Sequence, residues 1–325
     1  MEFSGLHHVT AVTADAPRNL DFYTNTLGLR LVKKTVNQDD VSAYHLFYGD
    51  EAGNPGTEVT FFDWAEMPPN VPGAGGIIEI GLRVPNRASL AWWVQRFDAL
   101  GVPHSGIEEV AGYPTVHFTD PEGQRLALVA GGSDAGFAPW RRSPVPTEHQ
   151  IRGLSHIGLA VSRLGPTART LTEVLNFRQS GVYPSPENPV VKTVVFESGA
   201  GGPGTEVRVE ERPELPPAQL GSGGVHHVAF RAPNDEEHRA WRDRVRAAGL
   251  GITDVIDRYY FKSLYFREPG RILFEIATDG PGFATDEDPE HLGERLALPP
   301  FLEPHRAAIE AGLRPLHSAE ISPGV

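Results

Sequence analysis

Alternating apolar and polar residues mark four strands, each of which opens a similar segment of the chain. Successive side chains of a strand point to opposite faces, and this pattern predicts strands at residues 5–13, 77–85, 153–162 and 225–233. Apolar residues then recur at three- and four-residue spacing, which predicts helices at residues 17–27, 87–100, 166–175 and 235–248. Three of these stretches run into a glycine, the residue with which helices commonly end: Gly28, Gly101 and Gly249.

Short strands separated by glycine and proline turns complete each segment. A turn announces the last strand every time, as in Asn54-Pro55-Gly56 and Glu268-Pro269-Gly270. The order β-α-β-β-β therefore occurs four times, in modules at residues 5–65, 75–130, 151–211 and 223–279. We predict an α+β protein with modules one and two in residues 1–130, a linker at 131–150, modules three and four in 151–279, and a C-terminal extension at 280–325 with one helix at 303–312.

Composition narrows the classes of function. The chain has 325 residues, 40% of them hydrophobic and 22% charged, as expected for a globular protein. A formal net charge of -13 and the lack of a basic run argue against a nucleic-acid partner. No apolar run reaches the roughly 18 residues that a membrane helix needs. The chain has no cysteine, which excludes disulfides and thiolate ligands, and shows no signal peptide, so we expect a cytoplasmic protein.

Two histidine doublets at equivalent repeat positions are the strongest chemical signal. His7-His8 lies in the first strand of module one, and His226-His227 lies in the first strand of module four. Glu275 stands inside an apolar run in the last strand of module four, where burial without a partner would be costly. Two imidazoles and one carboxylate form the donor set of a facial triad. This set suits non-heme Fe(II) and leaves coordination positions open for a substrate and O2.

An alignment of the modules lists the possible ligands. The position of His227 is taken by His8 in module one, Glu79 in module two and His156 in module three. Counted from the turn glycine, the position of Glu275 is taken by Phe61, Leu128 and Val209. Adjacency in sequence would pair module three with module four and so select His156, whereas His8 is the alternative from module one. The remaining histidines, His45 among them, lie in contexts typical of ordinary structural residues.

Longer motifs carry a family resemblance that spans nearly the whole chain. They comprise residues 35–40 (TVNQDD), 44–50 (YHLFYGD), 257–267 (DRYYFKSLYFR), 272–283 (ILFEIATDGPGF) and the tail segments 290–294 (EHLGE) and 298–302 (LPPFL). On these motifs the chain resembles the hydroquinone-type ring-cleaving dioxygenases of the vicinal oxygen chelate superfamily, which also contains glyoxalase I and antibiotic-resistance binding proteins.

The resemblance implies two glyoxalase-like half-barrel domains, with modules one and four forming the active half. It implies the metal ligands His8, His227 and Glu275, and as cofactor Fe(II), with Mn(II) as the alternative. The expected partners are a small aromatic diol and O2, and a homo-oligomer is expected at the level of the family.

Further roles follow from the same resemblance. Four more residues are expected beside the metal: His226 and Tyr265 for proton transfer and hydrogen-bond donation, Arg258 to stabilise an anionic oxygen, and His7 to orient a ligand. The aromatic residues Phe47, Trp92 and Tyr260 are candidates to line a ring pocket. Two alternatives stay open: a glyoxalase-type isomerase or lyase, and a protein that binds an aromatic ligand without catalysis.

Overall fold

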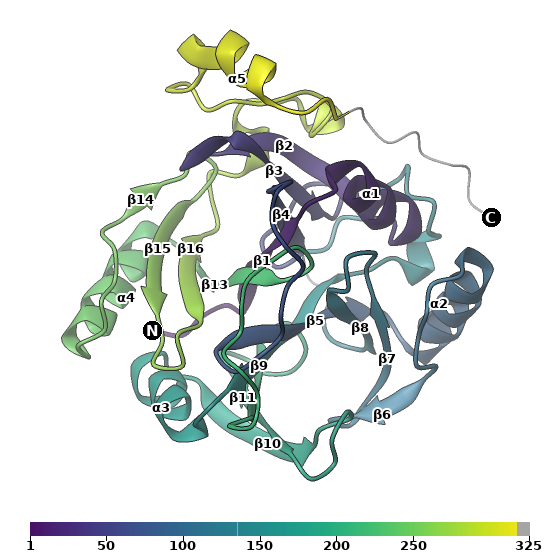
Figure 1. Cartoon of the computed structure of the whole chain (residues 1–325), viewed down its shortest axis with the longest axis vertical. Coiled ribbons are helices and arrows are strands. Elements are labelled where there is room, and N and C mark those ends of the chain that lie inside the picture. Colours follow the sequence, from purple (N-terminus) through teal and green to yellow (C-terminus); the bar gives the residue numbers. More distant parts are fainter. Residues whose placement is uncertain (135, 317–325) are drawn as a thin grey trace.

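Two curled eight-stranded sheets form the body of the protein (Figure 1). The computed structural model describes residues 1–134 and 136–316. Each of the four modules has the predicted β-α-β-β-β order. Among the described residues, no helix is long and apolar enough to span a membrane.

The elements of modules one and two keep close to the predicted bounds. Module one contains β1 (Leu6–Thr13), α1 (Ala16–Asp21), a π-helical turn (Phe22–Thr26), β2 (Arg30–Asn37), β3 (Asp40–Gly49) and β4 (Glu58–Asp63). Module two contains β5 (Gly76–Val84), α2 (Arg87–Leu100), β6 (Glu108–Val110), β7 (Tyr113–Thr119) and β8 (Arg125–Ala130).

Modules three and four repeat this order. Module three contains β9 (Gly153–Val161), α3 (Leu164–Arg169), a second π-helical turn (Thr170–Val174), β10 (Arg178–Pro184), β11 (Lys192–Glu197) and β12 (Glu206–Glu211). Module four contains β13 (Val225–Ala232), α4 (Asp235–Ala247), β14 (Ile256–Asp257), β15 (Lys262–Arg267) and β16 (Leu273–Thr278). The predicted C-terminal helix is a 3-10 turn (Glu303–His305) followed by α5 (Arg306–Gly312).

Helix α2 shows why the helices were readable from sequence. Asn86 caps its first turn by accepting a hydrogen bond from the Ser89 backbone N–H, and Gly101 ends it at a φ of 68°. The buried face carries Leu90, Trp93 and Phe97 at three- and four-residue spacing. Both end signals and the apolar spacing are local properties, so the predicted range agrees with the structure.

The sheets pair the modules differently from their order in the chain. One sheet runs β14-β15-β16-β13-β1-β4-β3-β2 and so joins module four to module one, while the other runs β10-β11-β12-β9-β5-β8-β7-β6. The first strands meet antiparallel at each centre, β1 with β13 and β5 with β9. The pairing of modules one and four agrees with the resemblance. The predicted linker at residues 131–150, between a domain of modules one and two and a domain of modules three and four, stays a prediction.

Strand register corrects the alignment of the last strands by one residue. Glu275 lies opposite Ala229, which is two residues after His227. The residues in the same position of modules one, two and three are Thr60, Ala127 and Arg208. The expected equivalents Phe61, Leu128 and Val209 were wrong because Gly270 is not the counterpart of the other turn glycines. Gly56, Gly123 and Gly204 have positive φ and stand two residues before their strands, and Arg271 takes that place before β16.

The C-terminal extension is attached to the sheet of modules one and four by a buried lysine. Lys33 is fully buried in β2, and its Nζ donates to the Phe283 carbonyl at 3.0 Å and to Asp286 Oδ1 at 2.7 Å, and it also pairs with Glu287. Tyr260 donates to the second Asp286 oxygen at 2.8 Å. The extension therefore supports the segment that carries Tyr260.

Candidate metal centre

Three predicted ligands converge at the middle of the sheet of modules one and four. Glu275 Oε2 lies 2.8 Å from His227 Nε2 and 3.2 Å from His8 Nε2. All three side chains are buried, and their ligand atoms lie within 4.8 Å of one another. The antiparallel contact of β1 with β13 produces this meeting, because it places Thr10 opposite His227 and brings His8 to the same face.

Hydrogen bonds fix the tautomer of His8. The His7 Nε2–H donates to the Thr278 carbonyl at 3.0 Å, and a carbonyl can only accept. Nδ1 of His7 then carries a lone pair and accepts from Nδ1–H of His8 at 2.9 Å. Nε2 of His8 is left with its lone pair directed at the position between the three ligands. Outer hydrogen bonds of this kind orient metal-binding imidazoles, and burial followed by the neighbouring His8 lowers the pKa of His7 to about 3.

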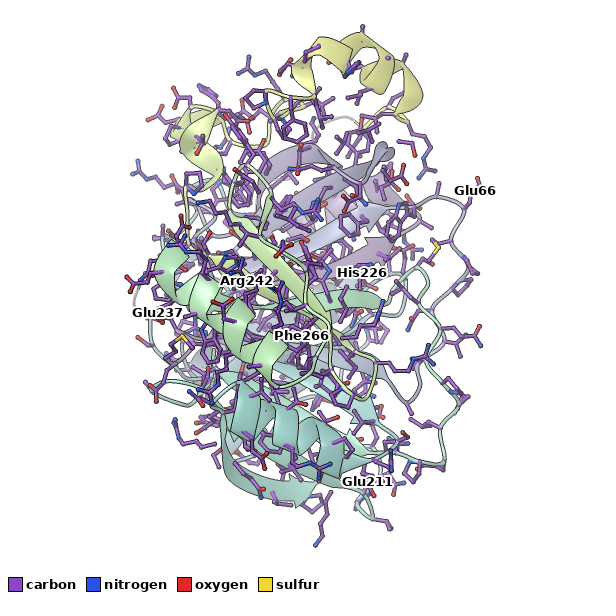
Figure 2. The ribbon with its side chains drawn as sticks, turned by 90° about the vertical axis from the view of Figure 1, so that its left-hand side faces the viewer. Glu66, Glu211, His226, Glu237, Arg242 and Phe266 are labelled. Carbon is purple, nitrogen blue, oxygen red and sulfur yellow. The ribbon has the colours of Figure 1, made fainter. Side chains whose placement is uncertain are left out.

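The second doublet has the same contact between Nδ1 atoms, but His226 has different surroundings from His7. Nδ1 of His226 lies 2.7 Å from Nδ1 of His227. The His226 ring also lies near Phe62 and Trp64, with centroid separations of 5.6 and 6.0 Å. It lines a groove that is separate from the cavity lined by His8 and His227. In Figure 2, His226 lies toward the segments that connect β4 to β5 and β12 to β13, away from Glu237 on α4.

Glu275 has the surroundings of a metal ligand. Its side chain is 0% exposed, and neither carboxylate oxygen has a hydrogen-bond partner among the described residues, despite the short distances to the imidazole nitrogens. Burial raises its pKa, and only positive charge or N–H donation from His8 and His227 would outweigh burial and lower that pKa. Since the hydrogen bonds of the first doublet leave Nε2 of His8 with a lone pair, a bound cation has to supply that charge. A buried, ionised carboxylate without hydrogen bonds is costly, and a divalent ion between the three ligand atoms removes that cost.

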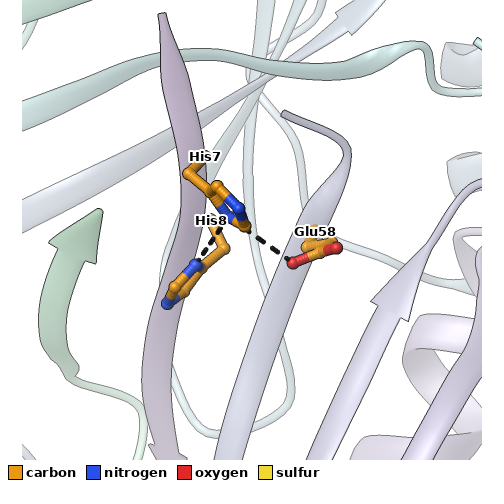
Figure 3. A group of neighbouring side chains, drawn as sticks. All are labelled: His7, His8 and Glu58. Atoms are coloured by element: carbon orange, nitrogen blue, oxygen red, sulfur yellow. Dashed lines mark hydrogen bonds and ion pairs between the residues drawn. The ribbon is translucent and has the colours of Figure 1, made fainter. Parts of the chain in front are cut away.

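A second cluster, formed by His7, His8 and Glu58, also has ligand atoms within 4.8 Å of one another (Figure 3). Its chemistry is less suitable for a metal. Burial, with Asp50 and Glu275 nearby, raises the pKa of Glu58 well above its usual range, so this carboxyl group stays protonated. Both ring nitrogens of His7 are already engaged in the hydrogen bonds to Thr278 and His8. The Glu275 cluster is therefore the better candidate.

An aromatic cavity opens over the triad. His8 and His227 line it together with Phe47, Phe62, Tyr260, Phe261 and Tyr265. The cavity measures about 40 Å³, whereas a pocket that encloses benzene measures about 150 Å³. An aromatic ring therefore needs the wall of the cavity to move before it can enter.

An ion pair between Arg258 and Asp39 forms part of this wall. Arg258 donates to Asp39 at 3.1 and 2.8 Å, and the Gln38 amide donates to the Arg258 carbonyl at 2.8 Å. Gln38 and Asp39 lie in the turn between β2 and β3, whereas Arg258 follows β14, so the contact joins the two edges of the curled sheet. The Asp39 side chain is 72% exposed, and exposed pairs of this kind are weak.

His45 is a site residue that the sequence analysis missed. It lines the cavity from β3, and its ring lies 3.9 Å from that of Phe47 and 4.5 Å from that of Phe62. Nε2 of His45 bonds Thr60 Oγ1 at 2.9 Å, and Thr60 donates to Thr10 at 2.8 Å. Nε2 of His45 therefore donates, and Nδ1 keeps a lone pair. The alternation of β3 and the motif at residues 44–50 were the available signals.

Tyr265 lies beside two of the candidate metal ligands, Glu275 and His227. It pairs with Glu275 across β15 and β16, and its ring lies edge-on to that of His227 at 5.7 Å. Burial and then the charge of Glu275 raise the pKa of Tyr265, so the phenol keeps its proton and is a hydrogen-bond donor at neutral pH. The Arg258 guanidinium lies 5.5 Å from the Tyr265 ring centroid.

Only some of the other residues considered in the sequence analysis line this cavity. Phe47 and Tyr260 line the cavity, whereas Trp92 lies on α2, where it packs against His149, and is not among the cavity residues. His156 belongs to the other sheet, where its Nε2 bonds Glu79 at 2.9 Å. His156 and Glu79 are thus partners in a buried polar pair.

Comparison with known proteins supplies the family. The model of the Glyoxalase/Bleomycin resistance protein/Dioxygenase superfamily matches residues 5–128 and 153–276. A Bacillus subtilis protein named "Putative ring-cleaving dioxygenase MhqA" is 48% identical over 97% of this chain and 100% of its own length. The "Chlorohydroquinone/hydroquinone 1,2-dioxygenase" of Sphingobium indicum is 32% identical over 92% of each chain.

A solved structure agrees with these relatives. The crystal structure of a "putative dioxygenase" from Bacillus subtilis has a TM-score of 0.89 and 38% identity, covering 98% of this chain and 99% of that one. The chain belongs to the Glyoxalase/Bleomycin resistance protein/Dioxygenase superfamily. The predicted fold class and the recognised family are confirmed.

Proposed function

We propose that this protein is a metal-dependent dioxygenase that opens the ring of hydroquinone-type diols with O2. The convergence of His8, His227 and Glu275 beneath an aromatic cavity is the observation that carries the proposal. The relative named a hydroquinone 1,2-dioxygenase supports the choice of a para-diol. Fe(II) is the proposed ion and Mn(II) the alternative, since two imidazoles and a carboxylate accept either.

The three ligands suit this role chemically. His8 and His227 would hold the ion through Nε2, and Glu275 through a carboxylate oxygen. The ion, when bound, supplies a Lewis-acidic site that accepts one substrate oxygen and activates O2. Thr60 is neutral at the module-one position that corresponds to Glu275. The site therefore lacks the second carboxylate expected of a glyoxalase-type centre.

Residues of the cavity would move protons and hold charge. His45 is our candidate acceptor for the proton of the substrate hydroxyl, because Nδ1 carries a lone pair. Burial and then His8 lower its pKa well below the usual value, so the imidazole is neutral at pH 7. Tyr265 would donate a hydrogen bond to oxygen as negative charge develops, and Arg258 would stabilise that charge. His7 and His226 would orient the two ligand imidazoles rather than touch the substrate.

The proposed reaction balances without a further reductant. One molecule of the diol combines with one O2, and the bond between the hydroxyl-bearing carbon and its neighbour breaks. One oxygen atom from O2 enters the new carboxylic acid and the other enters the new aldehyde. The product is a semialdehyde acid.

Oxygen uptake tests the proposal. The purified chain is loaded anaerobically with Fe(II) or Mn(II) and mixed with hydroquinone, methylhydroquinone, chlorohydroquinone and catechol. We expect uptake of one O2 for each para-diol consumed, with slower uptake for catechol. An absence of oxygen consumption with the whole panel sinks the proposal, and turnover of the thiol adduct of methylglyoxal by the same sample would favour an isomerase.

A further inference from the structure

A groove of about 520 Å³ lies beside the metal centre and outside the aromatic cavity. Its walls are residues 70–77, residues 217–226 and the β15–β16 turn. The first two segments lead from β4 to β5 and from β12 to β13, and they bridge each other at Val71 and Gln219. Phe62 lies at the boundary of the two spaces: it lines the cavity, and its ring centroid lies 5.6 Å from that of His226 in the groove.

The charge of this groove differs from that of the whole protein. The chain has 42 acidic and 29 basic residues, yet no aspartate or glutamate lines the groove in the part of the chain that the structure describes. Arg267 and Arg271 do line it, and neither forms an ion pair with a carboxylate among residues 1–134 and 136–316. Arg267 Nη1 donates to the Arg271 carbonyl at 2.8 Å, which leaves its other donors available.

Arg271 occupies a turn position that is glycine in the other modules. The strands β4, β8 and β12 begin two residues after Gly56, Gly123 and Gly204, and β16 begins two residues after Arg271. These glycines have φ values of 93°, 87° and 106°, and the φ of Arg271 is 78°. A residue other than glycine is strained in this region of backbone conformation. Strain that an arginine imposes and a glycine would relieve points to a role for the side chain.

Glycine, alanine and proline make up most of the opposite wall. A Cβ on Gly75 would lie 2.8 Å from the Gly270 carbonyl oxygen, and a Cβ on Gly73 would lie 2.2 Å from the Pro216 carbonyl oxygen. The connecting segments can approach each other and the β15–β16 turn because these two positions carry no side chain. The groove between them therefore stays open in front of the two guanidinium groups.

We propose that this groove is a binding site for small organic carboxylates. The guanidinium fork of arginine matches a carboxylate in charge and shape, and two such groups on one turn suit a molecule with one or two carboxylates. The assignment of the occupant rests on the proposed function: ring opening converts a neutral diol into an acid that is ionised at neutral pH. The groove would hold this acid next to the centre that forms it, with Arg267 and Arg271 as its ligands.

Titration calorimetry on the metal-free, full-length chain tests the site without turnover. Maleate is the probe for a small unsaturated dicarboxylate, and inorganic phosphate is the competing anion. We expect maleate to bind more tightly than phosphate and to bind more weakly as the salt concentration rises. The Arg267→Gln and Arg271→Gln variants should each bind maleate about tenfold more weakly, the loss expected for one charge-assisted hydrogen bond.

Two further variants make the test specific. Arg271→Gly keeps the length of the turn and relieves its strain, so this variant should be at least as stable as the wild type and still lose maleate binding. Arg295→Gln removes an exposed arginine of the C-terminal extension that lines a different groove, and should bind maleate like the wild type. Arg271→Lys should retain a part of the binding because it keeps the charge.

The results that overturn the proposal are distinct from those that concern the enzyme. No heat with maleate, or equal affinity in the wild type and the Arg267→Gln/Arg271→Gln double variant, excludes the carboxylate site. Tighter binding of phosphate, lost in the same variants, replaces it with a phosphate site and also overturns the proposal. Calorimetry does not depend on oxygen uptake, so a chain that binds maleate through both arginines but consumes no O2 would refute the proposed function alone.

Discussion

Replacing Glu275 by glutamine should abolish the stabilisation of the protein by a divalent ion. The substitution keeps the shape of the side chain but removes the buried charge that faces Nε2 of His8 and His227. In the wild type, a ligand at 100 times its dissociation constant stabilises the native state by about 2.7 kcal/mol. If loss of the carboxylate weakens binding about 100-fold, the same concentration then stabilises by only about 0.4 kcal/mol.

These free energies convert into melting temperatures. An unfolding entropy of about 2.1 cal/mol/K per residue gives a chain of 325 residues a shift of about 1.5 °C for each kcal/mol. The wild type should therefore melt about 4 °C higher with Fe(II) or Mn(II), measured anaerobically by scanning calorimetry, and Glu275→Gln should gain less than about 1 °C.

Glu58→Gln is the matched control. Glu58 is the carboxyl group of the neighbouring cluster with His7 and His8, and its raised pKa keeps it neutral. Its replacement by glutamine should leave the metal-dependent shift of the melting temperature intact. A full shift in Glu275→Gln together with a lost shift in Glu58→Gln would refute the reasoning and move the ion to the other cluster.

Further predictions follow from other parts of the structure. His8→Ala should lose bound metal in elemental analysis, whereas His156→Ala should retain it, because His156 belongs to the other sheet. The reverse result would move the metal centre to modules two and three. His45→Gln should keep its metal but consume O2 about 10²- to 10⁴-fold more slowly, as expected for loss of a proton acceptor, and an unchanged kcat would exclude this role. Asp39→Asn should lower KM for hydroquinone, because it weakens the ion pair at the mouth of the cavity. It should change the free energy of unfolding by less than about 1 kcal/mol. An unchanged KM would show that the ion pair does not restrict substrate entry. Burial raises the pKa of Asp120 above its ordinary value, to about 6, so the native state binds the proton more tightly than the unfolded chain does. This carboxyl group should therefore lower stability by up to about 3 kcal/mol as the pH rises from about 4 to about 6. Asp120→Asn should remove that loss in urea titrations at pH 7 and be neutral near pH 4, and equal stabilisation at both pH values would contradict this assignment.

The sequence by itself determined the elements and most of the ligand set. Strand alternation, helix caps and turn residues depend on neighbours within a few positions, which is why α2 and the first strand of each module were predicted to within a residue. The doublets at equivalent repeat positions and a lone carboxylate in an apolar strand pointed to His8, His227 and Glu275. The choice of His8 over His156 needed the family resemblance, because the repeat allowed both.

Only the tertiary structure decided which faces meet. The pairing of β1 with β13 is a contact between distant parts of the chain, and it brings module one to module four. The cavity position of His45 depends on the curl of a sheet whose edges approach at Asp39 and Arg258. Arg271 rather than Gly270 takes the turn position before β16, and this register makes Thr60 rather than Phe61 the counterpart of Glu275. Local patterns carry no information on such register shifts, since a slip of one residue sends each side chain of the strand to the opposite face.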